Sequence, residues 1–286
     1  MLRAWKWSAL ALAFVGGTTQ ASQIGPVGTY YLTDYENASD VSSLDAIRGN
    51  SIVQNPSINQ FQEGPIAVFT SPNVVRTTGF VPGYTGGEYA PVPSLTVSPT
   101  GPLYTSGLSG DEFYDGTTNG AVNFTVGFGS GNVMTTSTTW GGSGSLLFTA
   151  QSEDVGITYD ATNNSLWIQN YVTGVITDYT LAGAVITSFA TVGGFANDGY
   201  GSTALAMDVD HTLWFDDYGA GTIEHYTTTG TYLGSARYDG LGFALGGEIA
   251  AVAPVPEPAS LTLLGIGAVG IVVGARQRRR QQKTAV

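Results

Sequence analysis

The chain contains only two histidines, His211 and His225, and no cysteine. His211 falls in an Asp-His-Thr turn, whereas His225 falls in a separate strand next to Glu224, and no third ligand lies at metal spacing from either. Because a zinc site needs several nitrogen or sulfur ligands that converge on one ion, we expect both histidines to be solvated turn or strand residues. The lack of cysteine also excludes disulfides, thiolate metal sites and thiol nucleophiles.

Acidic residues are more plentiful and gather in two segments. One segment holds Asp208, Asp210, Asp216 and Asp217, and the other holds Asp111, Glu112 and Asp115. Ca²⁺ takes about six to eight oxygen ligands, but the spacing of an EF-hand is absent. We therefore expect solvated loop carboxylates and leave the presence of a metal site open. Two carboxylates that flank one cleft can hydrolyse glycosides, but a high density of acids does not by itself create such a cleft.

Two glycine-rich stretches resemble known motifs only in part. Gly142–Ser145 (GSGS) lacks the strand–turn–helix context of a hydrolase nucleophile. Gly127–Gly131 (GFGSG) is followed by no lysine and no helical pattern, so it predicts a hairpin turn and not a phosphate loop. The sequence therefore predicts no catalytic residue, no cofactor and no enzymatic activity.

The elements that position these residues come from an internal repeat. The segments that start at Ile157 and at Leu205 share a set of residues at a constant separation of 47 positions, including the pairs Trp167/Trp214, Tyr171/Tyr218, Gly174/Gly221 and Gly183/Gly230. The first copy predicts four short strands, at Ile157–Tyr159, Ser165–Gln169, Val175–Tyr179 and Ala184–Phe189. Four strands at this period are typical of a β-propeller blade, so we predict an all-β fold. Both tryptophans are expected in the core between blades, with exposed ligand-stacking rings as the alternative.

Weaker copies of the blade complete the ring. The segment from Thr29 has the pattern of the last three strands of a blade, and the segment from Gly246 has that of a first strand without successors. We expect these two to pair, Glu248–Val252 against Thr29–Thr33, and so to close the ring. Two degenerate blades lie between them, which gives about five blades. Six is the alternative, because the stretch from Ala90 to Ser109 has no clear strand pattern.

Charge is distributed very unevenly along the 286 residues. Between Ser22 and Val255 there are three basic and 21 acidic residues, a net charge of −18, whereas the other basic residues lie near the two ends. A surface this acidic repels phosphate backbones, so nucleic acid is excluded as a partner.

Both ends have the pattern of targeting segments. Residues 1–21 show the order of a charged, an apolar and a small-residue region, which predicts a secretory signal peptide, with a core helix as the alternative. Residues 260–275 form an uncharged apolar run that predicts a short transmembrane helix, with a buried soluble helix as the alternative. The basic residues that follow, Arg276, Arg278, Arg279 and Arg280, are expected to stay on the cytoplasmic side.

The C-terminal pattern resembles a known sorting signal. The segment consists of Pro256, Glu257 and Pro258, followed by the apolar run and the arginines. This order is similar to the PEP-CTERM signal of Gram-negative bacteria. The resemblance implies recognition at Pro256-Glu257-Pro258 by a membrane-embedded exosortase, a transient stay in the inner membrane, and a mature protein at the cell surface or in an extracellular polysaccharide or biofilm matrix. The chain then divides into a signal peptide (1–21), an exported domain (22–253) and a sorting segment (254–286).

The body resembles the propeller-like domains that precede such signals, with Thr158-Tyr159-Asp160 and Gly246-Gly247-Glu248 at blade positions. It also resembles NHL and SMP-30-type repeats, but no metal ligands of the latter can be placed here. Three functions stay open: a structural surface or matrix protein, which we favour, a glycan- or Ca²⁺-binding module, and a carbohydrate-active enzyme.

Overall fold

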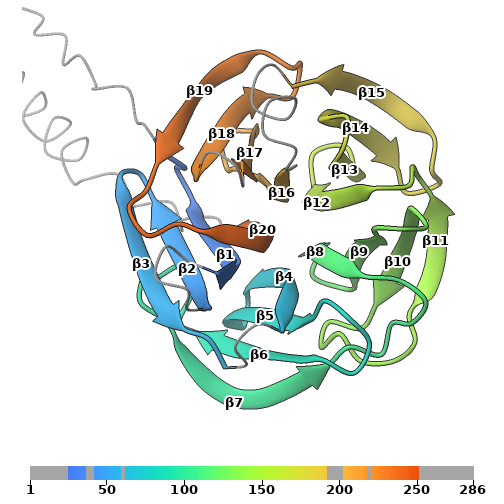
Figure 1. The fold of residues 1–286 in the computed structure, drawn as a ribbon. Helices are drawn as coiled ribbons and strands as arrows, with labels where there is room; N and C mark the ends of the chain where they lie inside the picture. Colours follow the sequence, from blue (N-terminus) through green and yellow to red (C-terminus); the bar gives the residue numbers. More distant parts are fainter. Residues whose placement is uncertain (1–24, 37–41, 59–61, 192–201, 218–220, 251–286) are drawn as a thin grey trace, which may run out of the picture.

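The protein is a five-bladed β-propeller, seen along its axis in Figure 1. It is described here from a computed structural model for residues 25–36, 42–58, 62–191, 202–217 and 221–250. These residues form twenty strands in five antiparallel four-stranded sheets. The innermost strands contact one another around the axis in the order β4, β8, β12, β16 and β20. The predicted all-β propeller is therefore confirmed, and five blades rather than six surround the axis.

Each blade begins with its innermost strand and ends with its outermost strand. The strands of blade I are β4 (Glu63–Thr70), β5 (Asn73–Gly79), β6 (Thr85–Ala90) and β7 (Ser98–Thr105). Those of blade II are β8 (Phe113–Thr118), β9 (Asn123–Gly127), β10 (Asn132–Thr136) and β11 (Ser145–Thr149). Those of blade III are β12 (Asp154–Asp160), β13 (Ser165–Asn170), β14 (Val175–Thr180) and β15 (Val185–Ala190). Those of blade IV are β16 (Ser202–Met207), β17 (Thr212–Asp217), β18 (Thr222–Thr227) and β19 (Tyr232–Arg237).

The closing blade joins the two ends of the propeller sequence. It consists of β20 (Phe243–Ala250) followed by β1 (Thr29–Glu36), β2 (Ser43–Arg48) and β3 (Ser51–Pro56). In the antiparallel pair of β20 and β1, Thr29 lies opposite Ala250 and Tyr31 lies opposite Glu248. The predicted closure is confirmed, with β20 starting earlier than expected; residues 251 and 252 lie outside the described residues.

Blades III and IV correspond to the repeat found in the sequence. Their strands agree with the predicted ones to within a few residues, and the repeated glycines occupy equivalent turns. Gly183 and Gly230 have φ angles of 82° and 83°. A Cβ at Gly183 would lie 2.8 Å from the Cβ of Phe148, and one at Gly230 would lie 2.7 Å from that of Phe189. Each glycine thus lets a hairpin approach the outermost strand of the preceding blade.

The two repeated tryptophans lie in the core, as predicted. Trp167 and Trp214 are each 2% exposed. Trp167, on β13, packs with Leu205 and Phe215 of blade IV, and Trp214, on β17, packs with Tyr30 and Leu32 of the closing blade. Each tryptophan therefore fills the space between its own blade and the next, which one small sheet cannot bury alone.

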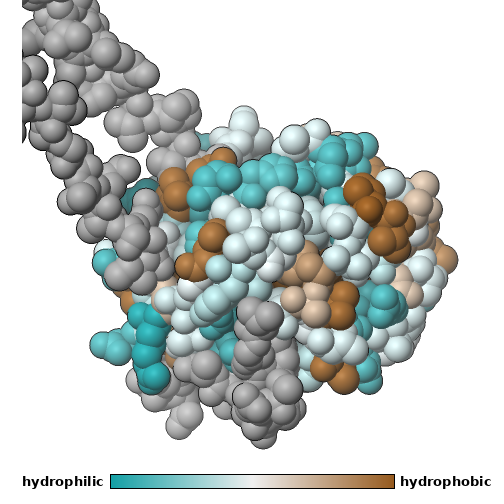
Figure 2. Space-filling model, turned by 90° about the horizontal axis from the view of Figure 1, so that it is seen from above, coloured by the Kyte–Doolittle hydropathy of each residue, from teal (hydrophilic) through white to brown (hydrophobic). Residues whose placement is uncertain are grey.

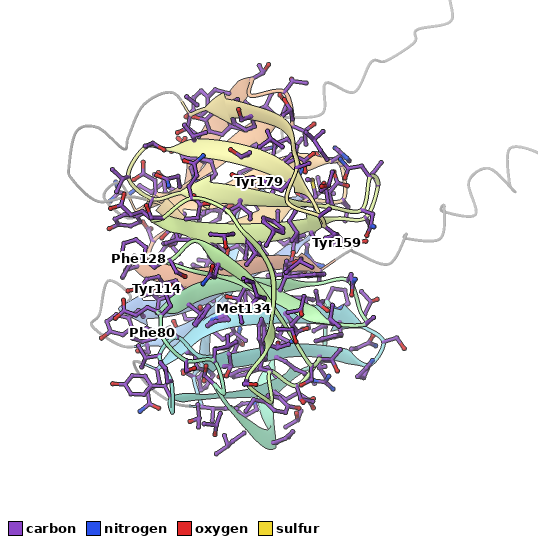
Figure 3. The ribbon with its side chains drawn as sticks, turned by 90° about the vertical axis from the view of Figure 1, so that its right-hand side faces the viewer. Phe80, Tyr114, Phe128, Met134, Tyr159 and Tyr179 are labelled. Atoms are coloured by element: carbon purple, nitrogen blue, oxygen red, sulfur yellow. The ribbon has the colours of Figure 1, made fainter. Side chains whose placement is uncertain are left out.

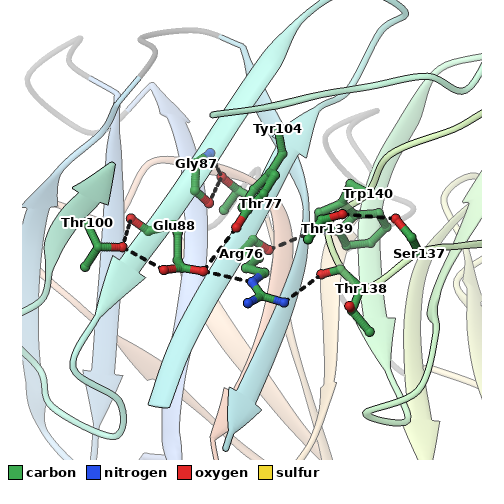
Figure 4. A network of polar contacts seen from close by, with 10 residues as sticks. All are labelled: Arg76, Thr77, Gly87, Glu88, Thr100, Tyr104, Ser137, Thr138, Thr139 and Trp140. Carbon is green, nitrogen blue, oxygen red and sulfur yellow. Dashed lines mark hydrogen bonds and ion pairs between the residues drawn. The ribbon is translucent and has the colours of Figure 1, made fainter. Parts of the chain in front are cut away.

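Blades I and II are joined by a polar network around Arg76 (Figure 4). The Arg76 Nε lies 2.9 Å from Glu88 Oε2, and its Nη1 donates to the carbonyl oxygen of Thr138 at 3.1 Å. The Trp140 Nε1 donates a hydrogen bond to the Arg76 carbonyl oxygen at 3.2 Å. Burial acts to raise the pKa of Glu88, but hydrogen bonds from Arg76, Thr100 and Tyr104 outweigh it and lower that pKa. The network connects the 137–140 loop of blade II to β5 and β6.

The rim of the propeller is mixed in polarity. Figure 2 looks onto one side of the rim and shows separate apolar patches among polar residues. On the outermost strands, Val185, Ile186 and Leu233 are exposed. Within the described residues, no helix is long and apolar enough to cross a membrane. The predicted signal peptide (1–21) and transmembrane helix (260–275) lie outside those residues.

Candidate functional site at the propeller axis

Every innermost strand has a register shift against the second strand of its blade. The shifts lie between Glu63 and Ile66, Phe113 and Gly116, Asp154 and Gly156, Thr203 and Ala206, and, on β1, Thr33 and Asp34. A β-bulge interrupts the ladder and leaves backbone groups without their partner strand. These groups need other partners, because buried N–H groups are costly when unsatisfied.

Asp115 on β8 supplies the acceptors for four backbone N–H groups of the innermost strands, which have a partner strand on one side only. Its Oδ2 accepts hydrogen bonds from the backbone N–H of Ile157 and Leu205, each at 2.9 Å, and its Oδ1 accepts from Gly247 and Gly116, each at 2.8 Å. These donors belong to β12, β16, β20 and β8. Burial raises the pKa of the Asp115 carboxyl, while the N–H donors act in the opposite direction. Asp115 is fully buried on the axis and connects four of the five blades.

Glu248 on β20 is a second buried acid at the axis. Its Oε1 accepts from the backbone N–H of Ile249 at 3.1 Å and from the Thr158 hydroxyl at 3.4 Å, while its buried Oε2 has no hydrogen-bond partner among the described residues. Burial is the main cause that raises the pKa of Glu248 to about 8. The raised pKa favours the protonated, neutral carboxyl, which can donate a hydrogen bond.

A cavity of about 420 Å³, which we call the polar mouth, opens at the end of the axis where the innermost strands finish. Its lining includes Thr117, Asp160, Asp208, His211 and Glu248, and no lysine or arginine. The His211 Nε2 lies 3.1 Å from Asp160 Oδ2, with the Asp160 side chain buried and that of His211 exposed. The arrangement offers hydrogen-bond donors and acceptors but no fixed positive charge.

Asp208 lines the polar mouth, but its carboxylate is hydrogen-bonded to backbone groups of the protein. Its carboxylate accepts from the backbone N–H of Val27 at 2.6 Å, of Gly28 at 2.8 Å and of Val209 at 2.7 Å. Burial raises the pKa of Asp208, and these N–H groups oppose the rise. The segment that precedes β1 is thereby attached to blade IV.

A second cavity, which we call the aromatic mouth, lies at the opposite end of the axis. It has a volume of about 260 Å³ and is lined by Tyr114, Phe128, Val155, Tyr171, Thr203 and Phe243. Strand β20 begins at Phe243 in this mouth and ends at Ala250, which lines the polar mouth. Figure 3 shows Phe80, Tyr114 and Phe128 along one face of the propeller and Tyr159 on the other.

The expectation of solvated carboxylates is wrong for most of the acids that it covered. Asp115, Asp208, Asp216 and Asp217 are buried, and only Asp111, Glu112 and Asp210 are at least partly exposed. Asp216 accepts a hydrogen bond from the backbone N–H of Ala244 at 3.1 Å, which again joins two blades. Acids of the inner and second strands therefore accept hydrogen bonds from buried backbone N–H groups, and so help to hold the blades together.

The histidines are apart from each other, as expected from their separate positions. His211 lies in the β16–β17 turn with a side chain that is 43% exposed, but its contact with Asp160 was not foreseen. The His225 ring stacks on Trp214 with ring centroids 3.8 Å apart, and its Nε2 lies 2.8 Å from Thr212 Oγ1. His225 is half-buried, so the expectation of a solvated strand residue fails for it.

The two glycine-rich stretches connect strands. Gly127–Gly131 forms the β9–β10 turn, as predicted, and the Asp111 carboxylate accepts from the N–H groups of Gly129 and Ser130 at 2.8 Å. Gly142–Ser145 lies at the connection from β10 to β11. In the part of the chain that the structure describes, no group of three or more His, Asp or Glu residues could hold a metal ion. The sorting-motif residues Pro256, Glu257 and Pro258 and the basic residues Arg276, Arg278, Arg279 and Arg280 lie outside that part.

The sequence did not single out Glu248, Asp160 or the aromatic mouth as sites. One signal was present, because the repeat aligns Tyr171 with Tyr218 at the end of the second strand. An aromatic residue stands at or next to the same place in the other blades, as Tyr35, Phe80 and Phe128. That regularity becomes visible only when the strand ends are known.

Comparison with known proteins identifies the C-terminal segment. Residues 254–280 match the PEP-CTERM protein-sorting motif. No curated protein matches the chain. Among solved structures, the nidogen/laminin complex is similar, with 9% identity and a TM-score of 0.50 over 78% of this chain and 98% of that chain. A virginiamycin B lyase from Staphylococcus aureus has 15% identity and a TM-score of 0.42 over 71% of this chain and 68% of its own.

At such identities the likeness to solved structures concerns the fold alone. The motif, in contrast, implies export, sorting by an exosortase, and a C-terminus anchored in the membrane before processing. The chain is thus a five-bladed β-propeller that carries a PEP-CTERM protein-sorting motif at residues 254–280.

Proposed function

We propose that this protein is displayed at the cell surface or in the extracellular matrix, where it acts as a structural or binding protein and not as an enzyme. The observation that carries the proposal is the position of the motif. Strand β20, which closes the ring, ends at Ala250, and the motif begins at residue 254. An enzyme that removes the motif would leave all five blades whole, so the processed product is a complete propeller.

The sorting steps follow from the residue types. Residues 1–21 start export, and the apolar run 260–275 holds the chain in the inner membrane with Arg276 and the arginines after it on the cytoplasmic side. Pro256 and Pro258 keep the backbone around Glu257 extended and unable to continue a helix. Glu257 is thereby presented to an exosortase-type enzyme, which is the partner that we propose.

The way in which Asp160 and Asp208 of the polar mouth are used supports a non-enzymatic role. Asp208 accepts three backbone N–H groups, and Asp160 accepts the N–H of Thr162 at 2.8 Å besides its contact with His211. Hydrogen bonds from backbone N–H groups stabilise the charged form of a carboxylate and so weaken it as a proton acceptor. A screen of the exported protein against polysaccharides tests this point, and turnover of any of them would overturn it.

Of the two binding alternatives, glycan binding has an observation in its favour. The aromatic mouth presents several rings around a cavity, whereas Ca²⁺ binding lacks a cluster of three acidic or histidine ligands within the described residues. Extracellular polysaccharide is therefore the partner that we propose beyond the sorting enzyme.

Cell fractionation with mass spectrometry tests the proposed sorting. We expect the mature protein outside the cell to lack residues from Gln277 onward, and we expect Glu257→Ala to accumulate in the inner membrane with its C-terminus intact. Asp239→Ala, which changes an exposed acid of the propeller, is the matched control and should be sorted normally. Peptides from Gln277 onward on the mature extracellular protein, or normal release of Glu257→Ala, would refute the proposal.

A further inference from the structure

A position that recurs from blade to blade supplies two rings of the aromatic mouth, Phe128 and Tyr171, and two rings beside it. Tyr35 lies near the end of β1, and Phe80, Phe128 and Tyr171 each directly follow the second strand of their blade. All four side chains are partly exposed. Since equivalent positions of a propeller project toward the same end of the axis, the four blades place these aromatic residues on one face.

The rings touch one another in a continuous arc. Ring centroids are 6.0 Å apart for Tyr35 and Phe80, 5.7 Å for Phe80 and Tyr114, 5.7 Å for Tyr114 and Phe128, and 5.9 Å for Phe128 and Tyr171. At the other end of the arc, Phe243 lies 6.4 Å from Tyr35. Most of these pairs are edge-to-face, a favourable arrangement for aromatic rings. The arc is therefore a preformed surface, which needs little ordering when a ligand binds.

The lining determines the class of ligand. Flat aromatic faces pack against the C–H faces of a sugar ring, and the hydroxyl oxygens of Tyr114 and Tyr171 provide polar atoms, the combination found in small-molecule sites. The cavity of about 260 Å³ is just below the usual size of drug-binding pockets, which suits one ring rather than an extended ligand.

The charge around the aromatic mouth indicates which kind of sugar it can bind. No basic residue lines it within the described part of the chain, and the Tyr114 hydroxyl donates to the carboxylate of Glu112, with Asp111 next in sequence. A body with three basic and 21 acidic residues also repels anions. We propose that the aromatic mouth binds one ring of a neutral carbohydrate, held by Phe128 and Tyr171. An acidic sugar does not fit this charge.

The attachment of the sorting motif leaves the aromatic mouth accessible. Ala250 lines the polar mouth, and residues 251–253 connect it to the motif. A chain that is held through its C-terminal segment is thus held at the polar mouth, and the aromatic mouth lies at the other end of β20. The inference rests on the proposed binding of polysaccharide and names its site and the class of sugar, whereas the proposed sorting does not depend on it.

Calorimetric titration of the full chain in detergent tests the proposal. The probes are neutral hexasaccharides of glucose, mannose, galactose and N-acetylglucosamine, with hexagalacturonate as the acidic comparison. We expect saturable binding of at least one neutral hexasaccharide and binding of hexagalacturonate that is at least about tenfold weaker. No binding of any neutral probe, or equal binding of the acidic one, would overturn the proposal whatever the outcome of the sorting experiment.

Variants locate the binding. Phe128→Ala and Tyr171→Ala should each weaken binding about tenfold or more, as expected for aromatic anchors at the centre of a site, and Tyr171→Phe should retain it. The matched control is Tyr159→Ala, which removes a partly exposed aromatic ring on the opposite face (Figure 3) and should leave affinity unchanged. The melting temperature of each variant separates a lost contact from a lost fold. Unchanged affinity in folded Phe128→Ala and Tyr171→Ala would show that the ligand binds elsewhere and would refute the site.

Discussion

The Asp115 carboxylate accepts a hydrogen bond at 2.8 Å from the backbone N–H of Gly247, a residue 132 positions later in the chain. The same carboxylate reaches Ile157 and Leu205, which lie 42 and 90 positions away. One side chain thus connects blades that are brought together only by the closed ring.

Replacement of Asp115 by asparagine should destabilise the propeller by about 3–5 kcal/mol. The amide keeps the shape of the carboxyl, but its NH₂ group faces two N–H donors, which are left buried without an acceptor. Urea unfolding monitored by circular dichroism gives the free energy of unfolding. Asp210→Asn, at an exposed turn, is the control and should stay within about 0.5 kcal/mol of the wild type. A loss at Asp115 as small as that of the control would contradict the role assigned to it.

Glu248 should make stability depend on pH. Its carboxyl keeps the proton up to about pH 8 in the folded protein, compared with about 4.5 in the unfolded chain. Between these values the folded state binds more protons, so the free energy of unfolding falls as pH rises. The contribution of Glu248 is fully present below the unfolded pKa and is lost as pH rises through the folded one, with a total of at most about 5 kcal/mol.

Urea midpoints at several pH values between 5 and 8.5 measure this effect. Glu248→Gln stays neutral throughout, so we expect a flatter dependence than in the wild type, while Glu112→Gln, at an exposed position, should keep the wild-type dependence. The other acids of the polar mouth, Asp160 and Asp208, are present in both proteins and cancel in the comparison. Equal slopes for Glu248→Gln and the wild type would disprove the assignment.

The two repeated tryptophans should behave alike. Trp167→Ala and Trp214→Ala each empty a large site between blades and should each cost about 3–5 kcal/mol in the free energy of unfolding. Tyr232→Ala, with a ring that is 42% exposed on β19, serves as the comparison and should cost much less. A loss below about 1 kcal/mol at both tryptophans would be incompatible with their burial.

The glycines at equivalent turns offer a further paired test. Alanine at Gly183 or Gly230 must adopt a left-handed conformation and also displace the ring of Phe148 or Phe189, so we expect each change to cost about 2 kcal/mol or more. Gly142→Ala is the matched control, because Gly142 has a φ of 86° but open space around it. Its expected cost is about 1 kcal/mol, from the backbone conformation alone. Thermal melts that show the same loss at all three positions would argue against the packing contribution.

The architecture could be predicted from the sequence, because strands and turns leave local patterns in it. Strand alternation, turn glycines and the 47-residue repeat identify blades III and IV, and the unmatched segments at Thr29 and Gly246 require each other. The fourth strands of blades I and II, β7 and β11, were harder to place, because their residues are largely exposed and carry little hydrophobic pattern.

The candidate site could not be predicted from the sequence, and the reason is physical. Asp115 reads as one more acid in an acidic chain, and its partners are backbone N–H groups, which every residue has. Whether such an N–H is free depends on the strand pairing, because the innermost strand of each blade has a partner strand on one side only. The same holds for Glu248, whose raised pKa results from burial by other blades.

The closing pair of strands also determines when the protein can fold. Strand β1 is the first described strand to be synthesised and β20 the last, and in the pair Thr29 meets Ala250. Contacts of such sequence separation form slowly, because most of the chain must be ordered before they contribute. The ring therefore cannot close before β20 has been made. A chain whose ring is still open suits passage through a narrow export channel, with ring closure on the far side.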